Sequence, residues 1–365
     1  MKITMIMSAI DMSGGAKVCA IYAQKMQDRG HIVNIIAPKK KLISFKQQLK
    51  NVLKGIGWKS TKDQLQNHFD LMQIKVIYVK SKQEINADNI PDADVIIATW
   101  WETAEWIKIL PNSKGIKVHF IQGYEVFSWL PIERVEAVYR LPFYKITISK
   151  TLVSTMEKYG HSSQLYLVPN AVDFKQFFAV PRNKQLRPTI GFLYSECPLK
   201  GIDVALKVIE NVKIHFPELR ILCFGSQKPN KYFPNYIEFE YNPKQDHLRD
   251  IYAQCDVWLC CSRSEGFHLP PLEAMACRCP LISTKVGGPE DIVQQGINGF
   301  LCEIDDVNDL ANKVIQILNS SEEEWQYLSK SALETATKYT WDDAANLFEK
   351  VLEKCIESSL NKDIP

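Results

Sequence analysis

The feature that most constrains the fold is the regular alternation of short apolar runs with amphipathic stretches. In the first half of the chain the runs include Ile3–Ser8, Val95–Ala98 and Val118–Ile121, and helical periodicity marks Ala16–Arg29. Short apolar runs separated by helical stretches are typical of buried parallel strands joined by helices. The sequence therefore predicts an α/β chain built from βαβ units. Further predicted elements are strands Val33–Ala37, Val76–Val79, Ile146–Ile148 and Leu165–Val168, and a helix over Thr151–Tyr159.

A second series of the same kind follows a joint near residues 174–188. Because 365 residues exceed what one hydrophobic core usually serves, we predict two domains. The first covers 1–180 and is completed by a C-terminal helix over 342–358, and the second covers 181–341. Ligands bind beyond the carboxyl ends of parallel strands, so we expect two Rossmann-like, doubly wound parallel sheets that face each other across a cleft. The second series comprises strands Thr189–Leu193, Arg220–Phe224, Ile237–Phe239, Val257–Cys260, Pro280–Ser283 and Gly299–Cys302, and helices Ile202–His215, His247–Gln254, Pro271–Ala276, Pro289–Gln295 and Val307–Asn319.

The cysteine spacing, the N-terminal segment and the lengths of the apolar runs indicate the cellular compartment in which the protein is expected. The ten cysteines include adjacent Cys260 and Cys261, and Cys277 and Cys279 have one residue between them, so the spacing of a zinc site is missing. The segment Lys2–Ser8 lacks the parts of a signal peptide, and no run of 18 apolar residues occurs. We therefore expect a cytoplasmic protein without a bound metal.

Two loops that follow predicted strands have the residues of an anion site. The segment Ser13–Ala16 contains Gly14 and Gly15 and opens a helix, where backbone N–H groups favour an anion, although a tight turn fits equally well. It is not a G-x-G-x-x-G motif, and Pro38–Lys41 stands where a dinucleotide-binding protein has a ribose-binding acid, which disfavours a nicotinamide dehydrogenase. Lys200, in the loop Cys197–Gly201, can pair with a diphosphate or be solvated.

The sharpest stretch is 262–273, which follows the predicted strand Val257–Cys260. Glu265 stands in a loop, and Glu273 stands in a helix whose first turn contains Pro271. Carboxylates there can accept hydrogen bonds from sugar or ribose hydroxyls, and the backbone N–H groups of Gly266–Leu269 can face phosphate or sugar oxygens. A helix with a favourable acid near its N-terminus is the competing interpretation.

The order of these motifs resembles the family 4 retaining glycosyltransferases, which have the GT-B fold. The donor-domain resemblance consists of Glu265 and Glu273, eight residues apart, followed by Ala274–Ala276, Val286–Glu290 and Gly296–Leu301. The resemblance covers most of the chain. The matching segments before it, in order, are Ser13–Ala16, Gly30-His31, Val168–Asp173 and Lys200-Gly201.

The resemblance implies a role for each matched residue. Glu265 is expected to contact the donor sugar near the reacting carbon, Glu273 to hold the ribose hydroxyls, and Lys200 to contact the diphosphate. Members of the family retain the anomeric configuration and need no bound metal or cofactor, so the leaving-group charge would be met by Lys200 and backbone N–H groups. The backbone groups implied to line the site are those of Gly266, Phe267 and His268 beside the sugar and Gly14 and Gly15 beside the phosphates.

Two positions depart from the family pattern. Ser195 stands five residues before Lys200, where the family usually has an arginine, and Arg263 is the candidate to supply that charge to the diphosphate. Gln122 stands where the family often has a histidine; it can hydrogen-bond a sugar hydroxyl but cannot act as a base. The leaving phosphate would then accept the proton. We interpret the nearby His119 as structural.

Three further residues follow strands of the first domain and are candidates for the acceptor side. Trp101, Tyr124 and Glu125 could contact or stack on a sugar, although packing in the domain fits the two aromatics equally well. Residues 39–62 carry eight lysines and no acid, with apolar residues at helical spacing. This pattern fits an anionic membrane surface, or a solvated helix packed on its own domain. No nucleic-acid-binding module surrounds it.

The function expected from the resemblance is glycosyl transfer from a nucleoside-diphosphate sugar to a hydroxyl of a glycan or lipid-linked acceptor. Such an enzyme would serve polysaccharide, glycolipid or glycoconjugate synthesis, in the cytoplasm or peripherally on the inner face of the membrane. Two alternatives remain open. One is a GT-B epimerase or phosphorylase, and the other is a catalytically silent partner that binds a sugar nucleotide, which the departures at Ser195 and Gln122 allow.

Overall fold

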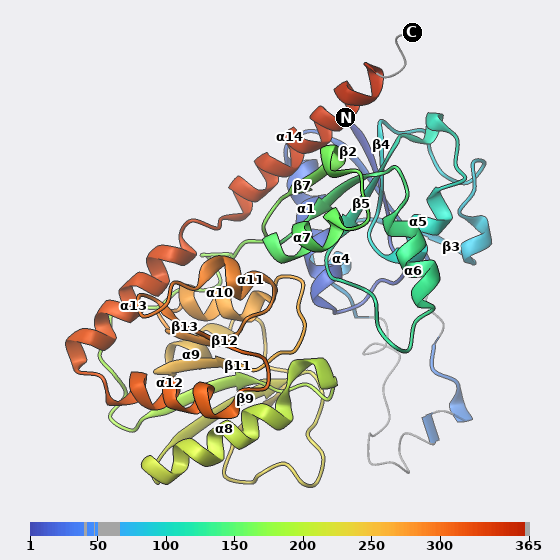
Figure 1. Cartoon of the computed structure of the whole chain (residues 1–365). Helices are drawn as coiled ribbons and strands as arrows, with labels where there is room; N and C mark the ends of the chain where they lie inside the picture. Colours follow the sequence, from blue (N-terminus) through green and yellow to red (C-terminus); the bar gives the residue numbers. More distant parts are fainter. Residues whose placement is uncertain (40–41, 47, 50–65, 362–365) are drawn as a thin grey trace. The chain divides into compact units, whose positions relative to one another are not determined.

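The chain forms two compact units in the computed structural model, which describes residues 1–39, 42–46, 48–49 and 66–361 (Figure 1). The first unit contains residues 1–148, 152–168 and those from Asp342 on, and the second contains 149–151 and 169–341. Residues 169–180, predicted in the first domain, cluster with the second. The reason is local pairing, since Val172 forms a β-bridge with Thr340 and Phe177 packs edge-on against Tyr252.

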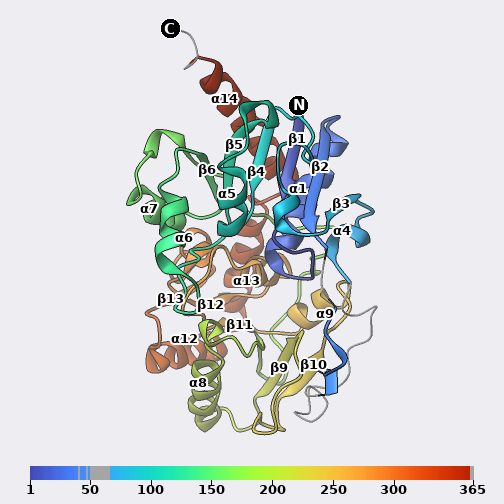
Figure 2. The same cartoon turned by 90° about the vertical axis from the view of Figure 1, so that its right-hand side faces the viewer.

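The described part of the first unit contains a parallel sheet of seven strands in the order β3-β2-β1-β4-β5-β6-β7. Figure 2 shows the labels β5, β4, β1, β2 and β3 following one another across this unit. Ile3 on β1 pairs with Val95 on β4, so the chain order reverses between these two strands. The strands are β1 (Lys2–Ile6), β2 (Ile32–Pro38), β3 (Val76–Val79), β4 (Val95–Ala98), β5 (Ile116–Ile121), β6 (Tyr144–Thr147) and β7 (Leu165–Leu167).

Helices cover this sheet, and the last helix of the chain packs on it too. Phe348 of α14 stacks on Tyr22 of α1 with ring centroids 4.4 Å apart, and Glu349 accepts a 2.8 Å hydrogen bond from Arg29. Helix α5 was not predicted; its start is fixed by Thr103, whose hydroxyl accepts from the Trp100 N–H at 3.0 Å. The helices are α1 (Gly14–Asp28), α4 (His68–Leu71), α5 (Trp101–Ile107), α6 (Ile132–Tyr139), α7 (Lys150–Glu157) and α14 (Trp341–Leu360), with short 3₁₀ turns at Lys82–Glu84, Asn112–Lys114 and Ser162–Gln164.

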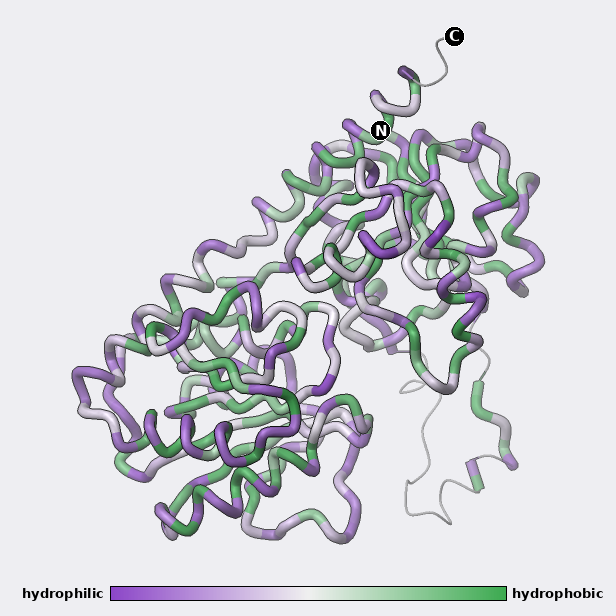
Figure 3. The backbone as a smooth tube through the Cα atoms, in the orientation of Figure 1, coloured by the Kyte–Doolittle hydropathy of each residue, from purple (hydrophilic) through white to green (hydrophobic). Residues whose placement is uncertain are grey.

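The second unit has a described parallel sheet of six strands in the order β10-β9-β8-β11-β12-β13. Helix α8 alternates hydrophobic and hydrophilic residues along its length (Figure 3) and buries its apolar face in the core. The strands are β8 (Thr189–Leu193), β9 (Arg220–Gly225), β10 (Glu238–Tyr241), β11 (Val257–Cys260), β12 (Leu281–Thr284) and β13 (Gly299–Cys302). The helices are α8 (Ile202–His215), α9 (Leu248–Ala253), α10 (Leu269–Ala276), α11 (Gly287–Ile292), α12 (Val307–Asn319) and α13 (Glu322–Ala336), with a 3₁₀ turn at Pro198–Lys200.

Helix α13, which was not predicted, is tied to the sheet through Asp256. The indole N–H of Trp325 donates to the Asp256 carbonyl at 2.9 Å, and the Asp256 carboxylate accepts from the Thr189 N–H at 2.9 Å. Ser321 and Glu324 form a reciprocal capping box at the helix start. These contacts hold the beginnings of β8 and β11 in place, which fixes the loops at their far ends.

The basic segment 39–62 falls largely outside the described residues, so its predicted amphipathic helix stays a prediction. Of the described residues at its start, Leu42, Phe45 and Leu49 are exposed. Within the described ranges, no helix has the length and apolar character needed to cross a membrane.

Candidate functional site

The two loops that carry the predicted donor residues leave neighbouring strands at the centre of the second sheet. β8 and β11 are paired, and the strand order reverses between them. Lys200 follows β8, and Glu265 follows β11 just before α10. A parallel sheet opens a crevice at such a reversal, beyond the carboxyl ends of the strands. The fold therefore brings both residues to the place where this sheet can hold a ligand.

Lys200 and Glu265 form an ion pair at this edge. The Lys200 Nζ lies 2.7 Å from Glu265 Oε1 and 2.9 Å from Oε2. The Ser262 hydroxyl donates to Oε1 at 2.7 Å. The Glu265 side chain is 9% exposed and that of Lys200 is 30% exposed, so the ammonium is the more accessible partner. Sequence analysis missed Ser262, although its position three residues before Glu265 is the spacing of a local side-chain hydrogen bond.

The charges at this edge are set by burial and by pairing. Burial pushes the pKa of Glu265 upward, but His268, Lys200 and the hydrogen bonds from Lys200 and Ser262 outweigh it and hold the pKa below its ordinary value. Burial lowers the pKa of His268 to about 4 against the opposing effect of Glu265. At neutral pH the carboxylate is therefore ionised and the imidazole is neutral.

His268 is held in an unusual conformation beside this pair. Its φ of 68° lies in the left-handed region, and its Nδ1 is 3.6 Å from Glu265 Oε1. Its side chain is 4% exposed, and neither ring nitrogen makes a hydrogen bond within the part of the chain that the structure describes. Strained backbone and unpaired buried nitrogens are costly, and such features concentrate at functional sites.

Two glycines at the start of α11 hold the loop of Glu265 from the other side. A Cβ on Gly287 would lie 2.6 Å from the Gly266 carbonyl oxygen, and one on Gly288 would lie 2.2 Å from that of Phe267. The Gly288 N–H donates to the Phe267 oxygen at 3.0 Å. Phe267 as a whole is buried, and its carbonyl is engaged by Gly288, so the predicted contact of the Gly266–Leu269 backbone with a ligand stays a prediction.

Glu273 lies one helix turn further along, on α10, and is 7% exposed. Its Oε2 accepts a hydrogen bond from the Tyr252 hydroxyl at 2.9 Å. Glu273 was predicted from the sequence, but Tyr252 was not, because in the sequence it looks like an ordinary apolar position of α9. The structure therefore places the two predicted carboxylates on the same loop and helix, each with a side-chain partner.

Arg263 is engaged with two carboxylates of the second unit. Its guanidinium pairs with Asp203 at 2.7 Å and Asp305 at 2.7 Å, and it also donates to the Pro198 carbonyl at 2.8 Å. The hydrogen bond with Asp203 raises the Arg263 pKa further. Arg263 thus ties three loops together, and its predicted contact with a diphosphate stays a prediction. Ser195 accepts a 3.2 Å hydrogen bond from the Cys197 N–H, which shapes the loop before Lys200.

A pocket of ≈ 380 Å³ lies in the first unit, at the edge of its sheet that corresponds to the edge carrying Lys200 and Glu265 in the second. It adjoins the ends of β1, β4 and β5, around the reversal between β1 and β4. Helix α1 begins there at Gly14, with Ser13 capping the Ala16 N–H at 3.3 Å. A Cβ on Gly14 would meet nothing within 4 Å, so that backbone is open to a ligand. The residues lining the pocket include Met7, Asp11, Ser13, Gly15, Thr99, Trp100, Gln122 and Glu125.

Gln122 and Glu125 line this pocket, but both also hold the unit together. The Gln122 amide donates to the Gly15 carbonyl at 3.3 Å and to the Cys19 sulfur at 3.2 Å. Glu125 Oε2 accepts from the Trp101 N–H at 2.8 Å. Burial raises the pKa of Glu125 to about 8, which the Trp101 N–H only partly opposes. Glu125 is therefore a largely neutral carboxyl group at pH 7.

The two aromatic candidates in this unit are packing residues. Trp101 is 3% exposed, and the Arg134 guanidinium covers its ring at 4.9 Å, so stacking of Trp101 on a sugar is wrong. The neighbouring Trp100 lines the pocket instead. Tyr124 hydrogen-bonds Tyr159 through its hydroxyl at 2.8 Å and packs against the core. The sequence does not show which of the two tryptophans faces the pocket. Trp100 and Trp101 are neighbours whose side chains point in different directions, and nothing in the pattern fixes which one points toward the pocket.

His119, interpreted as structural, lies wholly inside the first unit. Burial lowers its pKa to about 3, and the nearby Lys145 adds to this. Its ring packs on Tyr139 with centroids 5.9 Å apart. The structure thus places His119 in the core, away from the pocket lining.

The state of Glu125 predicts a pH-dependent stability. Its folded pKa of about 8 exceeds that of an unfolded carboxyl, about 4.3, so the folded chain binds more protons between these values and loses stability as the pH rises. Replacing Glu125 with glutamine removes this contribution. The Glu125→Gln variant should therefore gain stability relative to the wild type by about 1 kcal/mol per pH unit between pH 5 and 8.

Urea unfolding of both proteins at each pH measures this difference. Glu133→Gln, on the exposed face of α6, serves as the control and should show no such trend. A constant difference between Glu125→Gln and the wild type from pH 5 to 8 would show that Glu125 is ionised throughout.

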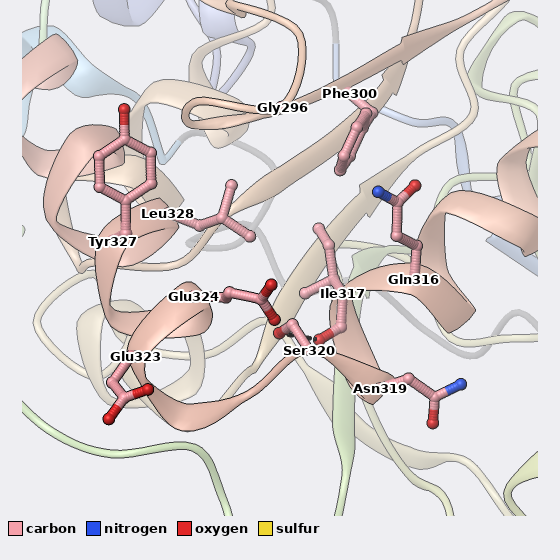
Figure 4. Close-up of a pocket in the computed structure, with 10 residues that line it drawn as sticks. All are labelled: Gly296, Phe300, Gln316, Ile317, Asn319, Ser320, Glu323, Glu324, Tyr327 and Leu328. Carbon is pink, nitrogen blue, oxygen red and sulfur yellow. Dashed lines mark hydrogen bonds between the residues drawn. The ribbon is translucent and has the colours of Figure 1, made fainter.

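Another cavity of the second unit lies away from Lys200 and Glu265. A groove of ≈ 680 Å³ runs between α12, α13 and β13 (Figure 4). Apolar groups of Phe300, Ile317 and Leu328 form its floor, and Glu324 beside it is already engaged in the capping box. Nothing in its lining resembles the charged pair of Lys200 and Glu265, so we do not assign it a role in chemistry.

The described side chains do not form a metal-binding cluster. In residues 1–39, 42–46, 48–49 and 66–361, no group of three or more His, Cys, Asp or Glu side chains is placed to hold a metal ion. All ten cysteines are free thiols, and only Cys197 is not fully buried.

Comparison with known proteins finds relatives for much of the second unit. Residues 187–320 match the family described as glycosyl transferases group 1. Over 171 residues the chain is 30% identical to an uncharacterized glycosyltransferase of Methanocaldococcus jannaschii, which covers 45% of this chain and 47% of that protein. Over 200 residues it is 26% identical to the N-acetyl-alpha-D-glucosaminyl L-malate synthase of Bacillus anthracis, or 53% of this chain and 46% of the relative. The chain thus spans about half the length of these curated relatives.

Solved structures show a likeness over the whole chain. HepE of Anabaena, in complex with UDP and glucose, has a TM-score of 0.74 at 16% identity and covers 97% of this chain and 99% of its own. Sucrose-phosphate synthase from Thermosynechococcus elongatus has a TM-score of 0.73 at 15% identity and covers 98% and 99%. These likenesses establish the predicted GT-B fold. The family match spans β8 to α12 and includes Lys200, Glu265 and Glu273. Residues 187–320 of the chain therefore resemble the group 1 glycosyl transferases.

Proposed function

We propose that the protein transfers a glycosyl group from a nucleoside-diphosphate sugar to a hydroxyl of a glycan or lipid-linked acceptor, with retention of anomeric configuration. The observation that carries this proposal is the ion pair of Lys200 and Glu265 at the strand reversal of the second sheet, with Glu273 on the adjoining helix. The arrangement offers one positive charge on the loop that follows β8, with two carboxylates and a helix start along the loop and helix that follow β11, and these groups suit a diphosphate, a sugar and a ribose.

Each group has a separate task in this proposal. The ammonium of Lys200, the more exposed member of the pair, meets the diphosphate and balances the charge that develops as the bond to the sugar breaks. Glu265, kept ionised by its surroundings, faces the sugar near the reacting carbon, where positive charge develops. The backbone N–H groups at the start of α10 add a partial positive charge.

Retention requires the acceptor oxygen to bond to the anomeric carbon on the face that the phosphate leaves. The bond from carbon to phosphate oxygen breaks, the bond to the acceptor oxygen forms, and the acceptor proton passes to the leaving phosphate. This route needs no protein base, which suits a first unit with Gln122 at its pocket and His119 buried in the core. The wholly buried, neutral His119 is not available for this purpose.

The relatives guide the choice of donor. One solved neighbour is a complex with UDP and glucose, and one relative is named N-acetyl-alpha-D-glucosaminyl L-malate synthase. We therefore propose uridine-diphosphate sugars as the first donors to test. A lipid-linked acceptor, and a peripheral place on the membrane, rest on the basic segment 39–62.

A panel of sugar nucleotides tests the proposed function. The full chain is incubated with UDP-, ADP- and GDP-sugars, and both binding and nucleotide release are followed, with and without glycan and lipid-linked acceptors. We expect binding of at least one donor in the micromolar range and acceptor-dependent release, with NMR of the product showing retention. Heat-unfolded protein is the control.

The outcomes separate the alternatives. Binding without release on any acceptor would favour the silent sugar-nucleotide-binding partner. Release that depends on inorganic phosphate, or a donor converted to its epimer, would favour a phosphorylase or an epimerase. Failure to bind any member of the panel would contradict the proposal.

A further inference from the structure

The contact between Tyr252 and Glu273 carries an inference about donor recognition. We infer that Tyr252 is the residue that positions Glu273 to bind the ribose of the donor nucleotide, and this rests on the proposed function. Glu273 is the acid that would take the ribose hydroxyls, and Tyr252 makes a direct hydrogen bond to it at 2.9 Å. Tyr252 is fully buried and cannot touch the nucleotide itself, so it acts only through Glu273.

Tyr252 is anchored on all sides by aromatic rings. Its ring lies 4.5 Å from that of Trp258 on β11, 5.8 Å from Phe224 on β9 and 6.0 Å from Phe177. Edge-on packing against rings from separate segments leaves the tyrosine ring one orientation. The hydroxyl at its tip is therefore a fixed point in the second unit.

The hydroxyl can serve Glu273 only as a donor. Burial raises the pKa of Tyr252 well above its ordinary value, and the charge of Glu273 raises it further. The phenol thus keeps its proton at any pH at which the protein is handled. That proton is donated to Glu273 Oε2 at 2.9 Å.

The consequence is a carboxylate that is ordered before the nucleotide arrives. A glutamate side chain rotates about three bonds, and ordering it costs conformational entropy. The hydrogen bond from Tyr252 orders Glu273 when the protein folds, so this entropy is not lost when the nucleotide binds. Glu273 is 7% exposed, so most of the residue is enclosed in the second unit. Tyr252 should therefore contribute to recognition of ribose hydroxyls and to nothing else in the reaction.

Paired ribonucleotides and deoxyribonucleotides measure this contribution. The probes are UDP, ADP and GDP, each compared with its 2′-deoxy and 3′-deoxy counterparts by calorimetry on the full chain. We expect the wild type to prefer a ribonucleotide over at least one deoxy form by about 10-fold. In Tyr252→Phe the ribonucleotide should bind about 3- to 10-fold more weakly while the deoxy form binds as before, and kcat at saturating donor should stay within about twofold.

Two further variants show that the effect passes through Glu273. Glu273→Gln should reduce the ribose preference, and adding Tyr252→Phe to it should cause no further loss, because the two residues act as one unit. Tyr194→Phe, which removes another buried tyrosine hydroxyl of the second unit, is the matched control and should leave the preference intact. Equal weakening of ribo and deoxy forms in Tyr252→Phe, or no change in either, would overturn the inference.

The failures of the inference and of the proposed function are distinguishable. If the wild type binds no nucleotide, both fail; if Glu273→Gln keeps the full ribose preference, the ribose role of Glu273 fails and the inference with it. If Glu273→Gln loses the preference and Tyr252→Phe keeps it, only the inference fails. Should Tyr252→Phe not fold, Glu273→Asp replaces it, since the shorter side chain keeps the charge but draws it away from Tyr252. Full ribose preference in Glu273→Asp would likewise overturn the inference.

Discussion

Replacing Glu265 with alanine is expected to lower turnover by about 10³-fold while the chain remains folded. The carboxylate is held near the proposed position of the reacting carbon by bonds from Lys200 and Ser262, and its charge would oppose the positive charge that develops on the sugar. The loss should fall on kcat. Donor affinity should not decrease, because removing Glu265 frees the ammonium of Lys200 for the diphosphate. Steady-state kinetics with the donor identified in the panel measure both quantities.

Companion variants separate charge from shape in this prediction. Glu265→Gln keeps the size and loses the charge, so it should be nearly as slow as Glu265→Ala. Lys200→Met should instead weaken donor binding, and it also leaves Glu265 buried without its cation. Glu334→Ala, which breaks an exposed ion pair with Lys330 on α13, is the control and should leave the kinetics unchanged. Normal turnover by folded Glu265→Ala would refute the role assigned to this residue.

Much of the fold could be predicted, because it depends on local patterns. The strands Thr189–Leu193, Val257–Cys260 and Gly299–Cys302 and the helices Ile202–His215 and Val307–Asn319 have the predicted bounds. Each is a continuous apolar run or a clear helical stripe with polar or turn residues at its ends. Helices α5 and α13 were not predicted, although α13 begins with Ser321 and Glu324 at the spacing of a capping box, which is a signal in the sequence. Their formation depends on caps from Thr103 and Ser321.

The site was predicted less completely, because its contacts join residues far apart in the chain. Sequence order placed Lys200 and Glu265 on adjacent loops but could not show that they pair, which depends on β8 lying beside β11. The same limit hid the two partners of Arg263, whose carboxylates are 60 and 42 residues away. Tyr252 was missed for this reason too, since its hydroxyl and its ring packing are indistinguishable in sequence from an ordinary core position.

Replacing Gly201 with alanine is expected to destabilise the second unit by about 3 kcal/mol or more. Gly201 follows Lys200 directly and has a φ of +62°, and a Cβ there would lie 1.9 Å from the carbonyl oxygen of Cys261. The backbone fixes the position of the Cβ, and the oxygen is itself a backbone atom, so no side-chain rotation can relieve the clash. Either the loop of Lys200 or the loop of Glu265 must move, which separates the two residues of the ion pair. Donor affinity should therefore fall together with stability.

A second glycine of the same unit separates the two causes of the destabilisation, which are the strained φ and the clash of the Cβ. Gly296 has a φ of +72°, but a Cβ there would meet only Phe300, at an ordinary 3.9 Å. Gly296→Ala thus carries the conformational strain without the clash and should cost about 1 kcal/mol, with donor binding unchanged. Thermal unfolding should then place Gly201→Ala several degrees below Gly296→Ala. Equal stability of the two variants would mean that the loops of Lys200 and Glu265 can separate freely, and a donor site built on their fixed contact would no longer be tenable.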